Sequence, residues 1–456
     1  MQTASTTTIS ATKKSLDALG LSIDVSESEI DRLSRDYFWY SPILNEQLKE
    51  KRGQLIVRPT SQNEVIMLAA VCAQQKVPLT VRGGGTGNYG QCVPLRGGVI
   101  LDATGLNKIK AIHNGWATVE TGVLIYDLHQ AARRQGQQIL MYPSTERIAT
   151  IGGFIAGGHS GIGSIRHGIL KDPGNVTRIR VVTLEASPKV IDLVGEDIQK
   201  VHHAYGTNGI ITELDVALTP AIDWLHVIST FPSYADVLKF GLAVGNMSVN
   251  ENRKIDVFQL SAVERRITPY YQSLRSILGD DDAMFAQVSK DSFEAYAKLS
   301  QKFGGQTALV DTEDNLFARG LPNATECAYN HTTLQALKSD DGVTYLQVAF
   351  PSPFSPELVE ELMKEFGDEV LMHHEFAKME DVLTVFALPL VRYFDEAQIN
   401  NLIARFEARG CYIFNPHTYW IEDGGMKQID TNQIDFKKLA DPLGLMNPGK
   451  TRGWTD

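Results

Sequence analysis

Glycine gathers in two segments of this chain, and no other feature constrains the fold as strongly. The first segment, residues 82–90, reads Arg-Gly-Gly-Gly-Thr-Gly-Asn-Tyr-Gly and follows a short apolar stretch. The second, residues 152–168, carries seven glycines in seventeen positions. Ordering glycine costs more backbone entropy than ordering any other residue, so such clusters indicate a close approach to the backbone. A glycine-rich surface turn is an alternative for the first segment alone, whereas the two together favour a large, flat ligand.

The first glycine segment also contains a motif known from Rossmann domains. Residues 85–90 match Gly-x-Gly-x-x-Gly, with Asp102 downstream. That fingerprint requires a helix to begin at the loop, but residues 91–98 contain Pro94 and two glycines and cannot form one. Consecutive glycines also let several backbone N–H groups converge on one anion, which suits a pyrophosphate. We therefore expect a phosphate-binding loop outside the Rossmann context.

The first half of the chain predicts a mixed α+β region. Apolar residues 55–57, a helix opened by Ser61 and Glu64 at capping-box spacing, and a strand over 79–82 predict a βαβ unit. Ser26 and Glu29 predict a further capping box upstream. Hydrophobic patterns predict strands over 98–101, 109–113, 117–121, 139–142, 176–185 and 211–218, and helices over 124–135 and 150–156.

After Trp224 glycine becomes rarer and amphipathic patterns dominate. They predict helices over 234–244, 262–278, 292–303 and 356–366, and strands over 344–350 and 383–388. We expect an N-terminal helical segment (1–50), a first α+β domain (51–224), a second α+β domain (225–400) and a C-terminal segment (401–456).

Composition excludes several classes of protein. The 456 residues are 43% hydrophobic and 21% charged, as in an ordinary globular protein. The net charge of −11, without a long basic run, argues against a nucleic-acid partner. No run of 18 apolar residues occurs, so we expect no membrane span. Four scattered cysteines without a Cys-x-x-Cys pair favour a reducing compartment, and we expect a cytoplasmic protein.

A third piece, Gly-Thr-Asn-Gly-Ile-Ile at residues 206–211, completes a recognisable set. The three pieces resemble, in order and spacing, the flavin domain of the vanillyl-alcohol-oxidase family, also called the PCMH-type FAD-binding domain. Its patterns are Arg-Gly-x-Gly-Thr, Thr-Ile-Gly-Gly and Gly-Thr-x-Gly-Ile, and the closing Asn-Pro-Gly-Lys at 447–450 matches as well. Within the family, the chain resembles most the D-2-hydroxyacid dehydrogenase and glycolate-oxidase-subunit branch. The resemblance implies an α+β fold, with a PCMH-type FAD-binding domain of two α+β subdomains and an α+β cap (substrate) domain.

The resemblance implies FAD as cofactor. The first loop would hold the pyrophosphate, the second the ribityl chain and isoalloxazine, and residues 209–211 the adenine half. The implied binding residues are Arg82, Gly83, Gly84, Gly85, Thr86, Gly87, Asn88, Pro143, Ser144, Thr150, Gly152, Gly153, Gly157, Gly158, His159, Ser160, Gly163, Gly209, Ile211, Asn447 and Lys450. Some relatives attach the flavin covalently through a histidine after the first glycines; Thr86 and its neighbours provide none, so we expect non-covalent FAD. Residues 157–161 depart from the branch, and His159 either contacts the flavin or packs against the loop.

A site for a 2-hydroxy acid needs a cation for the carboxylate and a base for the hydroxyl proton. Arg319 ends a stretch that resembles the branch's Leu-Trp-x-x-Arg and is the implied carboxylate partner; a solvated arginine at a helix end is the alternative. His417 stands where the branch has Ser-Gly-Glu-His-Gly and is the implied base, with a packed structural histidine as the alternative. If residues 415–419 form a strand, Asn415 and Tyr419 share the face of His417. Tyr419 and His374 are further catalytic candidates.

A metal site is a weaker option. His373-His374-Glu375 stand where the branch carries Gly-His-x-Gly-Asp-Gly-Asn-x-His, but the second histidine is missing and Glu380 and Asp381 follow instead. We expect no metal. An ion that prefers oxygen ligands is the alternative, and two polar residues beside a strand are the simplest explanation.

The resemblance therefore implies an FAD-linked oxidase or dehydrogenase acting on CH–OH groups. Hydride would pass to flavin N5 from a small hydroxy substrate, with a 2-hydroxy acid preferred and an alcohol, phenol or sugar as the alternative. A flavin-binding protein without catalysis is the alternative from another class. The electron acceptor (O₂, a quinone or a protein) and the oligomeric state, with a homodimer as one option, stay open.

Overall fold

The computed structural model describes residues 4–249, 253–426 and 428–454. Contacts divide the chain into two units, which we describe separately. Unit 1 comprises Met1–His159, Pro173–Ala221 and Pro416–Asp456. Unit 2 comprises Ser160–Asp172 and Ile222–Asn415.

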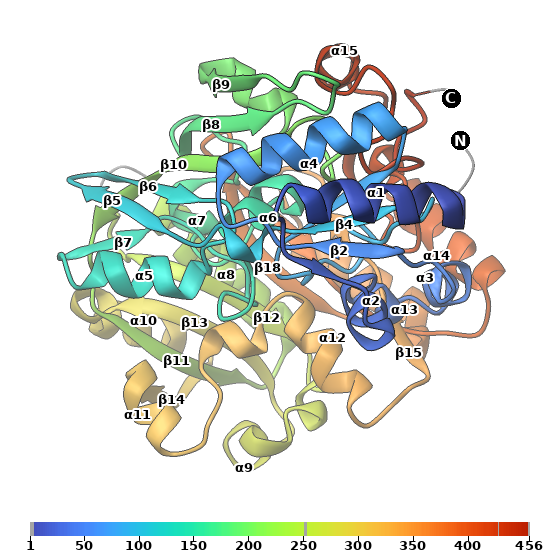
Figure 1. Cartoon of the computed structure of the whole chain (residues 1–456). Coiled ribbons are helices and arrows are strands. Elements are labelled where there is room, and N and C mark those ends of the chain that lie inside the picture. Colours follow the sequence, from blue (N-terminus) through green and yellow to red (C-terminus); the bar gives the residue numbers. More distant parts are fainter. Residues whose placement is uncertain (1–3, 250–252, 427, 455–456) are drawn as a thin grey trace. The chain divides into compact units, whose positions relative to one another are not determined.

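The βαβ unit predicted in the first half is confirmed. Unit 1 has a sheet of order β1-β2-β4-β3, in which the last three strands are parallel. Figure 1 shows β2 and β4 side by side. The strands are β1 (Ile23–Asp24), β2 (Leu55–Val57), β3 (Leu79–Arg82) and β4 (Val99–Asp102). The helix α4 (Gln62–Gln75) begins where the Ser61 hydroxyl accepts from the Glu64 N–H at 3.3 Å. Because parallel strands end at the same edge, the loops that follow β2, β3 and β4 gather there.

A second sheet of unit 1 is antiparallel, with order β5-β6-β10-β8-β9, and β7 pairs with the end of β10. Its strands are β5 (Ile109–His113), β6 (Trp116–Glu120), β7 (Gln137–Ile139), β8 (Val176–Val182), β9 (Val190–Val194) and β10 (Ile210–Pro220). The strand predicted over 139–142 lies over 137–139 instead. The strand predicted over 176–185 ends at Val182, because Thr183 N–H then bonds to Lys189 O and closes a hairpin.

The helices of unit 1 include three from the N-terminal segment. The three are α1 (Thr6–Ala18), α2 (Glu27–Leu33) and α3 (Pro42–Leu48). The other helices of unit 1, besides α4, are α5 (Ile125–Arg133), α6 (Ile151–Gly157) and α15 (Thr431–Ala440). The capping box predicted at Ser26 is wrong, because its side chain makes no capping hydrogen bond. The Ser26 N–H donates instead to Asp24 Oδ1 at 2.7 Å, in a turn ahead of α2.

Unit 2 is built on an eight-stranded sheet of order β14-β11-β13-β12-β18-β19-β16-β21, in which all neighbouring strands are antiparallel. Its strands are β11 (Trp224–Phe231), β12 (Val257–Val263), β13 (Asp282–Ser289), β14 (Gln306–Asp311), β16 (Val348–Ala349), β18 (His373–Met379), β19 (Val382–Ala387) and β21 (Tyr412–Ile413). A small sheet of order β15-β20-β17 joins β15 (Val343–Tyr345), β17 (Val370–Leu371) and β20 (Leu390–Arg392). The helices are α7 (Ser164–His167), α8 (Tyr234–Val249), α9 (Arg275–Leu278), α10 (Phe293–Lys302), α11 (Glu313–Ala318), α12 (Asn330–Leu337), α13 (Pro356–Phe366) and α14 (Glu396–Ala408).

Two predictions for unit 2 are wrong in an instructive way. The helix predicted over 262–278 begins inside strand β12, and only 275–278 is α-helical. Gln259 and Ser261 alternate with apolar neighbours in β12, a period of two that suits a strand, and Pro269 interrupts the rest. The strand predicted over 344–350 splits into β15 and β16, which pair in different sheets.

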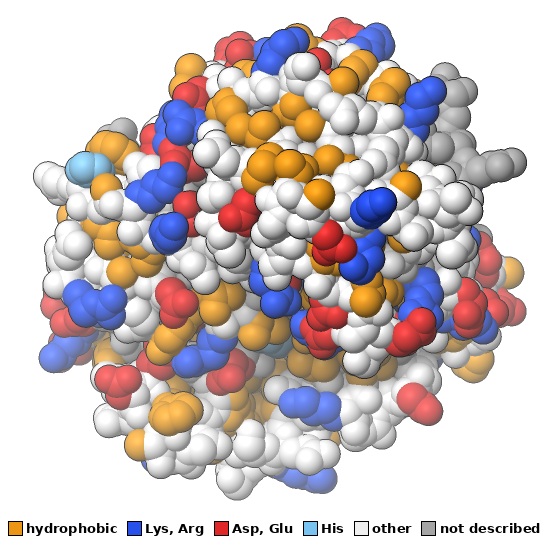
Figure 2. Space-filling model, viewed as in Figure 1, with side chains coloured by type: hydrophobic (Ala, Val, Ile, Leu, Met, Phe, Trp, Pro, Cys, Tyr) orange, Lys and Arg blue, Asp and Glu red, His pale blue; other side chains and the backbone are white. Residues whose placement is uncertain are grey.

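The surface agrees with the mixed charge of the sequence. Figure 2 shows acidic and basic side chains interspersed over the face in view. No described helix combines the length and the apolar character that crossing a membrane requires.

Candidate functional site

The first glycine loop leaves β3 with its backbone amides unused. The N–H groups of Gly84 to Gly87 donate no hydrogen bond to the residues that the structure describes. The Gly87 carbonyl, in contrast, accepts from the Tyr37 N–H at 2.7 Å. Successive amides without a protein partner form the kind of concavity that binds an anion.

Packing against residues 148–150, just before the second glycine segment, explains Gly83 and Gly84. A β-carbon on Gly83 would lie 2.1 Å from Thr150 Oγ1, and one on Gly84 would lie 2.0 Å from the carbonyl oxygen of Ile148. Thr150 Oγ1 also accepts from the Gly153 N–H at 3.2 Å at the start of α6. The sequence argument assigned the close approach to a ligand. At these positions the two segments of the protein approach each other.

Gln91, which the sequence analysis did not single out, joins the two glycine segments. Its Nε2 donates to Gly157 O at 2.9 Å, and a β-carbon on Gly87 would lie 1.9 Å from its Oε1. Further along, His203 Nδ1 lies 2.9 Å from the carbonyl oxygen of Gly158 and donates to it. The His203 ring also lies edge-on to His159, at 6.3 Å between centroids. A flavin contact of His159 stays a prediction.

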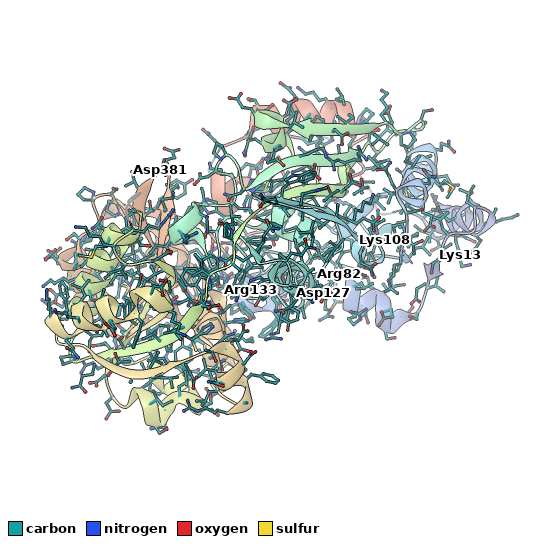
Figure 3. The ribbon with its side chains drawn as sticks, turned by 90° about the vertical axis from the view of Figure 1, so that its left-hand side faces the viewer. Lys13, Arg82, Lys108, Asp127, Arg133 and Asp381 are labelled. Carbon is teal, nitrogen blue, oxygen red and sulfur yellow. The ribbon has the colours of Figure 1, made fainter. Side chains whose placement is uncertain are left out.

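Arg82 supports the first loop from the inside of unit 1. Its guanidinium donates to the carbonyl oxygens of Leu33, at 3.2 Å, and of Arg35. Figure 3 shows Arg82 within the fold, whereas Lys13 lies on the outer helix α1. A β-carbon on Gly85 would lie 2.2 Å from Arg82 Cζ. The side chain of Arg82 therefore shapes the loop from beneath.

The C-terminal motif holds the same loop. Asn447 Nδ2 donates to Gln91 O at 2.7 Å and to Tyr205 O at 2.6 Å. Lys450 is fully buried, and its Nζ donates to Gly90 O. Both residues were predicted to bind the cofactor, and the structure shows how they fix the backbone of its predicted binding loop.

Buried charges lie beneath the loop. Burial raises the pKa of Asp36 to about 6, against the attraction of Lys450. Burial likewise lowers the pKa of Lys450 to about 7, against the attraction of Asp36. The loop thus stands on a group of ionisable side chains with little solvent around them.

The remaining residues predicted to bind the flavin, Pro143, Ser144, Gly209 and Ile211, lie at turns or directly after one. The Pro143 carbonyl accepts from the Glu146 N–H at 3.0 Å, in a turn that contains Ser144 and leads to α6. Gly209, at φ +86°, precedes Ile211 at the start of β10, and its N–H donates to Met446 Sδ at 3.2 Å.

His417 lies buried in unit 1, the unit of the glycine loops. Its Nδ1 is 2.7 Å from Ser41 Oγ. The described residues around it form no strand, because β21 ends at Ile413 and residues 416–417 form a turn. Tyr419 therefore does not share a strand face with His417; its ring lies 5.3 Å from Lys450 Nζ.

Arg319 lies in unit 2 just after α11. Its side chain is 50% exposed, and its Nη1 lies 2.9 Å from Asp311 Oδ2. This ion pair matches the alternative of a solvated arginine at a helix end more closely than a preformed carboxylate site. Its substrate role stays a prediction.

His374 is buried in the apolar interior of unit 2. The Tyr234 hydroxyl donates to Ala262 O at 3.1 Å, so its oxygen accepts from His374 Nδ1 at 2.8 Å. The rings of Phe350 and Phe354 pack around the imidazole. Burial lowers the pKa of His374 to about 3, so the ring is neutral at physiological pH. These surroundings favour a structural histidine.

The histidines considered as metal ligands lie apart from the carboxylates of Glu380 and Asp381. His373 Nε2 pairs with Glu375 Oε1 at 2.8 Å inside the sheet. Glu380 and Asp381 lie in the turn beyond β18, roughly 20 Å along the strand from His374 at about 3.3 Å per residue. Among the described residues, no three His, Cys, Asp or Glu side chains are arranged to hold a metal ion.

A polar network that the sequence analysis missed crosses the sheet of unit 2. The carboxylate of Glu375 accepts from Ser261 Oγ at 2.6 Å and from the Tyr329 N–H at 2.6 Å. On the same face, Gln259 Nε2 donates to Ser261 Oγ at 3.1 Å, and Gln287 Nε2 donates to Gln259 Oε1 at 3.3 Å. Scattered singly in the sequence, these residues form no motif that could have revealed them.

Tyr329 connects this network to the end of the second glycine segment. It has φ +49° and ψ −136°, a strained backbone for a residue with a side chain. Its hydroxyl donates to Gly161 O at 2.9 Å, and the Gly163 N–H donates to Phe258 O at 2.8 Å. Ser160 and Gly163, predicted to contact the flavin, thus belong to a segment anchored on strands of unit 2.

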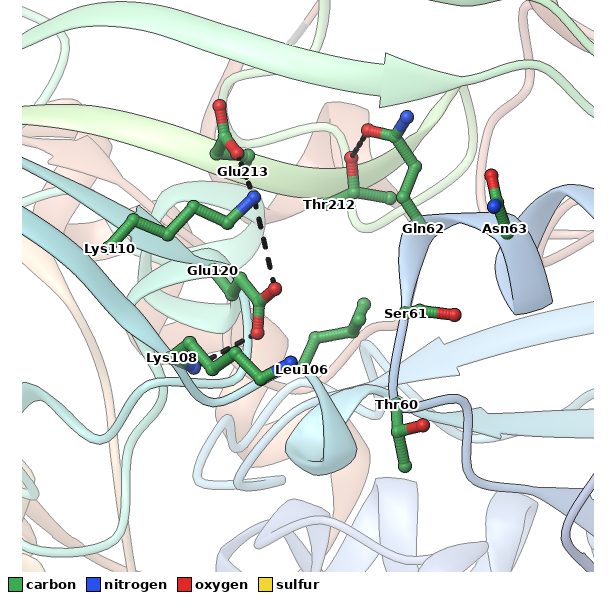
Figure 4. Close-up of a pocket in the computed structure, with 10 residues that line it drawn as sticks. All are labelled: Thr60, Ser61, Gln62, Asn63, Leu106, Lys108, Lys110, Glu120, Thr212 and Glu213. Carbon is green, nitrogen blue, oxygen red and sulfur yellow. Dashed lines mark hydrogen bonds and ion pairs between the residues drawn. The ribbon is translucent and has the colours of Figure 1, made fainter.

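A separate pocket of about 230 Å³ opens at the N-terminal end of α4 (Figure 4). Lys110 forms an ion pair with Glu213 there and lies 3.9 Å from Glu120. The pocket is lined by Thr60, Ser61, Gln62, Asn63, Leu106, Lys108, Lys110, Glu120, Thr212 and Glu213. None of the predicted site residues lines it.

Comparisons with known proteins point to the same cofactor as the glycine loops. Residues 53–192 match a family model described as FAD binding domain. A D-lactate dehydrogenase of Anaerostipes hadrus is 33% identical over 37% of this chain and 37% of its own length. The glycolate oxidase subunit GlcD of Bacillus subtilis is 30% identical over 58% of each chain. In both cases the match spans less than two thirds of the relative.

Solved structures extend the likeness to nearly the whole chain. An alkyldihydroxyacetonephosphate synthase superposes with a TM-score of 0.72 at 15% identity, covering 99% of this chain and 87% of the other. The 4-ethylphenol oxidase from Gulosibacter chungangensis gives a TM-score of 0.70 at 16% identity, covering 98% and 97%. Residues 53–192 therefore match an FAD binding domain, and the expected α+β fold is confirmed.

Proposed function

We propose that the protein is an FAD-dependent oxidoreductase that oxidises a small 2-hydroxy acid. The observation that carries the proposal is the run of unused amides from Gly84 to Gly87, inside a domain that matches FAD binding domains. Relatives named D-lactate dehydrogenase and glycolate oxidase subunit support a hydroxy acid as the substrate.

The residues of unit 1 suit FAD. The loop amides would hold the pyrophosphate, the segment that begins at Thr150 would line the ribityl chain and ring, and Gly209 and Ile211 would lie by the adenine half. When bound, FAD would supply the hydride acceptor. We propose non-covalent binding, since the first loop contains no histidine.

Two side chains would act on the substrate. His417 would take the hydroxyl proton as the C–H bond breaks, and Arg319 would pair with the carboxylate. His417 is buried in unit 1, the unit that also holds the first glycine loop.

Replacing His417 tests the proposed base. His417→Asn should retain FAD while anaerobic flavin reduction slows by roughly 10²–10⁴-fold, the usual worth of a positioned base. His113→Asn, the same change at an exposed histidine of β5, is the control and should reduce at close to the wild-type rate. Stopped-flow absorbance measures both. A rate for His417→Asn within a few fold of wild type would remove His417 from the mechanism.

A second candidate function is oxidation of an alcohol, phenol or sugar. The shared fold with a 4-ethylphenol oxidase favours it, as does the exposed ion pair of Arg319. We further propose a cytoplasmic location on the cysteine usage, and either O₂, a quinone or a protein as electron acceptor. A homodimer is the proposed option for assembly.

A further inference from the structure

We infer that Ser41 is a positioning residue for the base His417, a role that rests on the proposed function of His417. Ser41 Oγ lies 2.7 Å from His417 Nδ1, across 376 positions of sequence. Ser41 is fully buried and His417 is 5% exposed. The N-terminal segment, to which the sequence assigned no site residue, thereby contributes to the site.

The fold fixes the oxygen of Ser41. Ser41 is the N-cap of α3, and its Oγ accepts from the Leu44 N–H at 3.1 Å. Pro42 follows at the first helical position, which favours the start of a helix there. Leu44 and Leu48 pack α3 into a buried apolar cluster. The hydroxyl oxygen is therefore held by a helix end that is itself anchored in the core.

The contact has two possible directions, which correspond to the two neutral forms of the imidazole: the Ser41 hydroxyl donates to Nδ1, or an Nδ1–H donates to the hydroxyl oxygen. A hydroxyl oxygen has two acceptor positions, and the Leu44 N–H takes one. We assign the second to an Nδ1–H of His417. In the neutral ring, Nε2 then carries the lone pair, which is the form that a base acting through Nε2 requires. The same hydrogen bond holds the orientation of the ring.

Ser41 variants test the role in catalysis. Ser41→Ala should slow flavin reduction at saturating substrate by roughly 10–100-fold, the usual effect of losing a group that orients an active side chain. The dissociation constants of FAD and substrate should stay within about twofold, because neither ligand loses a contact in this account. Ser41→Thr keeps the hydroxyl and should restore the rate to within a few fold.

Ser61→Ala is the matched control. Ser61 caps α4 as Ser41 caps α3, with its Oγ 3.3 Å from the Glu64 nitrogen, and α4 carries no part of the His417 contact. Losing that cap should leave flavin reduction unchanged. An equal slowing in Ser61→Ala would show a general effect of helix stability and overturn the inference.

A spectroscopic readout tests the contact without turnover. Protein labelled with ¹⁵N-histidine should show the ring of His417, assigned by its absence in His417→Asn, with the proton on Nδ1. Ser41→Ala should shift that signal toward the other tautomer, and Ser61→Ala should not. An unchanged His417 signal in Ser41→Ala would overturn the inference.

The two proposals fail in different ways. If His417→Asn reduces flavin at the wild-type rate, the base assignment fails and the inference falls with it. If His417→Asn is slow while Ser41→Ala keeps the wild-type rate, His417 remains the base and only the role of Ser41 is overturned.

Discussion

Gly85 illustrates how one residue can be required for two reasons. Its φ of +66° favours glycine, and a β-carbon would overlap the Arg82 guanidinium. Gly85→Val should therefore weaken FAD binding strongly, through a displaced loop. Gly20→Val is the control, since Gly20 has φ +76° with no atom within 4 Å of a β-carbon. Flavin fluorescence titration compares them; unchanged FAD affinity in Gly85→Val would contradict the loop assignment.

Arg319 provides a test of the substrate's carboxylate. If Arg319 binds it, Arg319→Lys should raise KM because the two-pronged guanidinium contact is lost, while the flavin spectrum stays normal. Asp311→Asn keeps the arginine but removes its partner, 2.9 Å away, and should not raise KM. Steady-state kinetics with an identified acid substrate measure the KM of each variant. Equal turnover by wild type and Arg319→Ala would remove Arg319 and favour an alcohol or sugar.

Motifs in the sequence located the binding loops but not their supports. The glycine segments, Asn447 and Lys450 follow a family pattern and could be named from it. Gln91 and Ser41 belong to no pattern, because a single polar residue acquires its role only when distant segments meet. The glycines of both segments were assigned to a ligand because sequence does not show that Thr150 fills the space beside Gly83, or Thr121 the space beside Gly152.

Burial inside helices and strands lowers the pKa of three histidines, among them His374 of β18. Burial lowers the pKa of His374 to about 3, of His167 to about 3 and of His226 to about 4. The unfolded chain, with histidines near 6.5, then binds more protons than the folded one. Stability should therefore fall as pH decreases from about 6.5 toward 3.

His374→Phe should reduce this acid sensitivity. Between pH 6 and 4 the stability of the variant should fall less steeply, by roughly 1.4 kcal/mol per pH unit. His113→Phe, at an exposed position, is the control and should keep the wild-type slope. Thermal unfolding at a series of pH values measures it. Parallel curves for wild type and His374→Phe would show that His374 is not a buried neutral group.

Helices and strands whose apolar residues recur with one clear period were predicted well. Segments whose apolar spacing fits both a helix and a strand were not. The helix α13 (Pro356–Phe366) matches its prediction at both ends, because Ser355 caps it and its apolar stripe is regular. Residues 262–278 failed because an apolar strand followed by turns also satisfies a loose helical spacing. Tertiary pairing with β13 and β18 decides between the two.

At the scale of the whole molecule, two units divide the predicted roles. Unit 1 contains the first glycine loop, the second glycine segment as far as His159, and His417. Unit 2 contains the rest of that segment, Arg319, His374 and the polar network around Glu375. The α+β class and the flavin domain followed from motif order, which is local information. The network of unit 2 did not, because residues from four different strands and loops compose it.

Anaerobic reduction of the purified protein tests the central claim most directly. The oxidised, FAD-loaded protein is mixed without oxygen with D-lactate, glycolate and other 2-hydroxy acids, and in parallel with alcohols, phenols and sugars. We predict that the yellow flavin absorbance bleaches with at least one 2-hydroxy acid and with none of the other compounds. Bleaching by an alcohol, phenol or sugar alone would contradict the proposed substrate, and a flavin that only a chemical reductant bleaches would contradict the proposed enzyme.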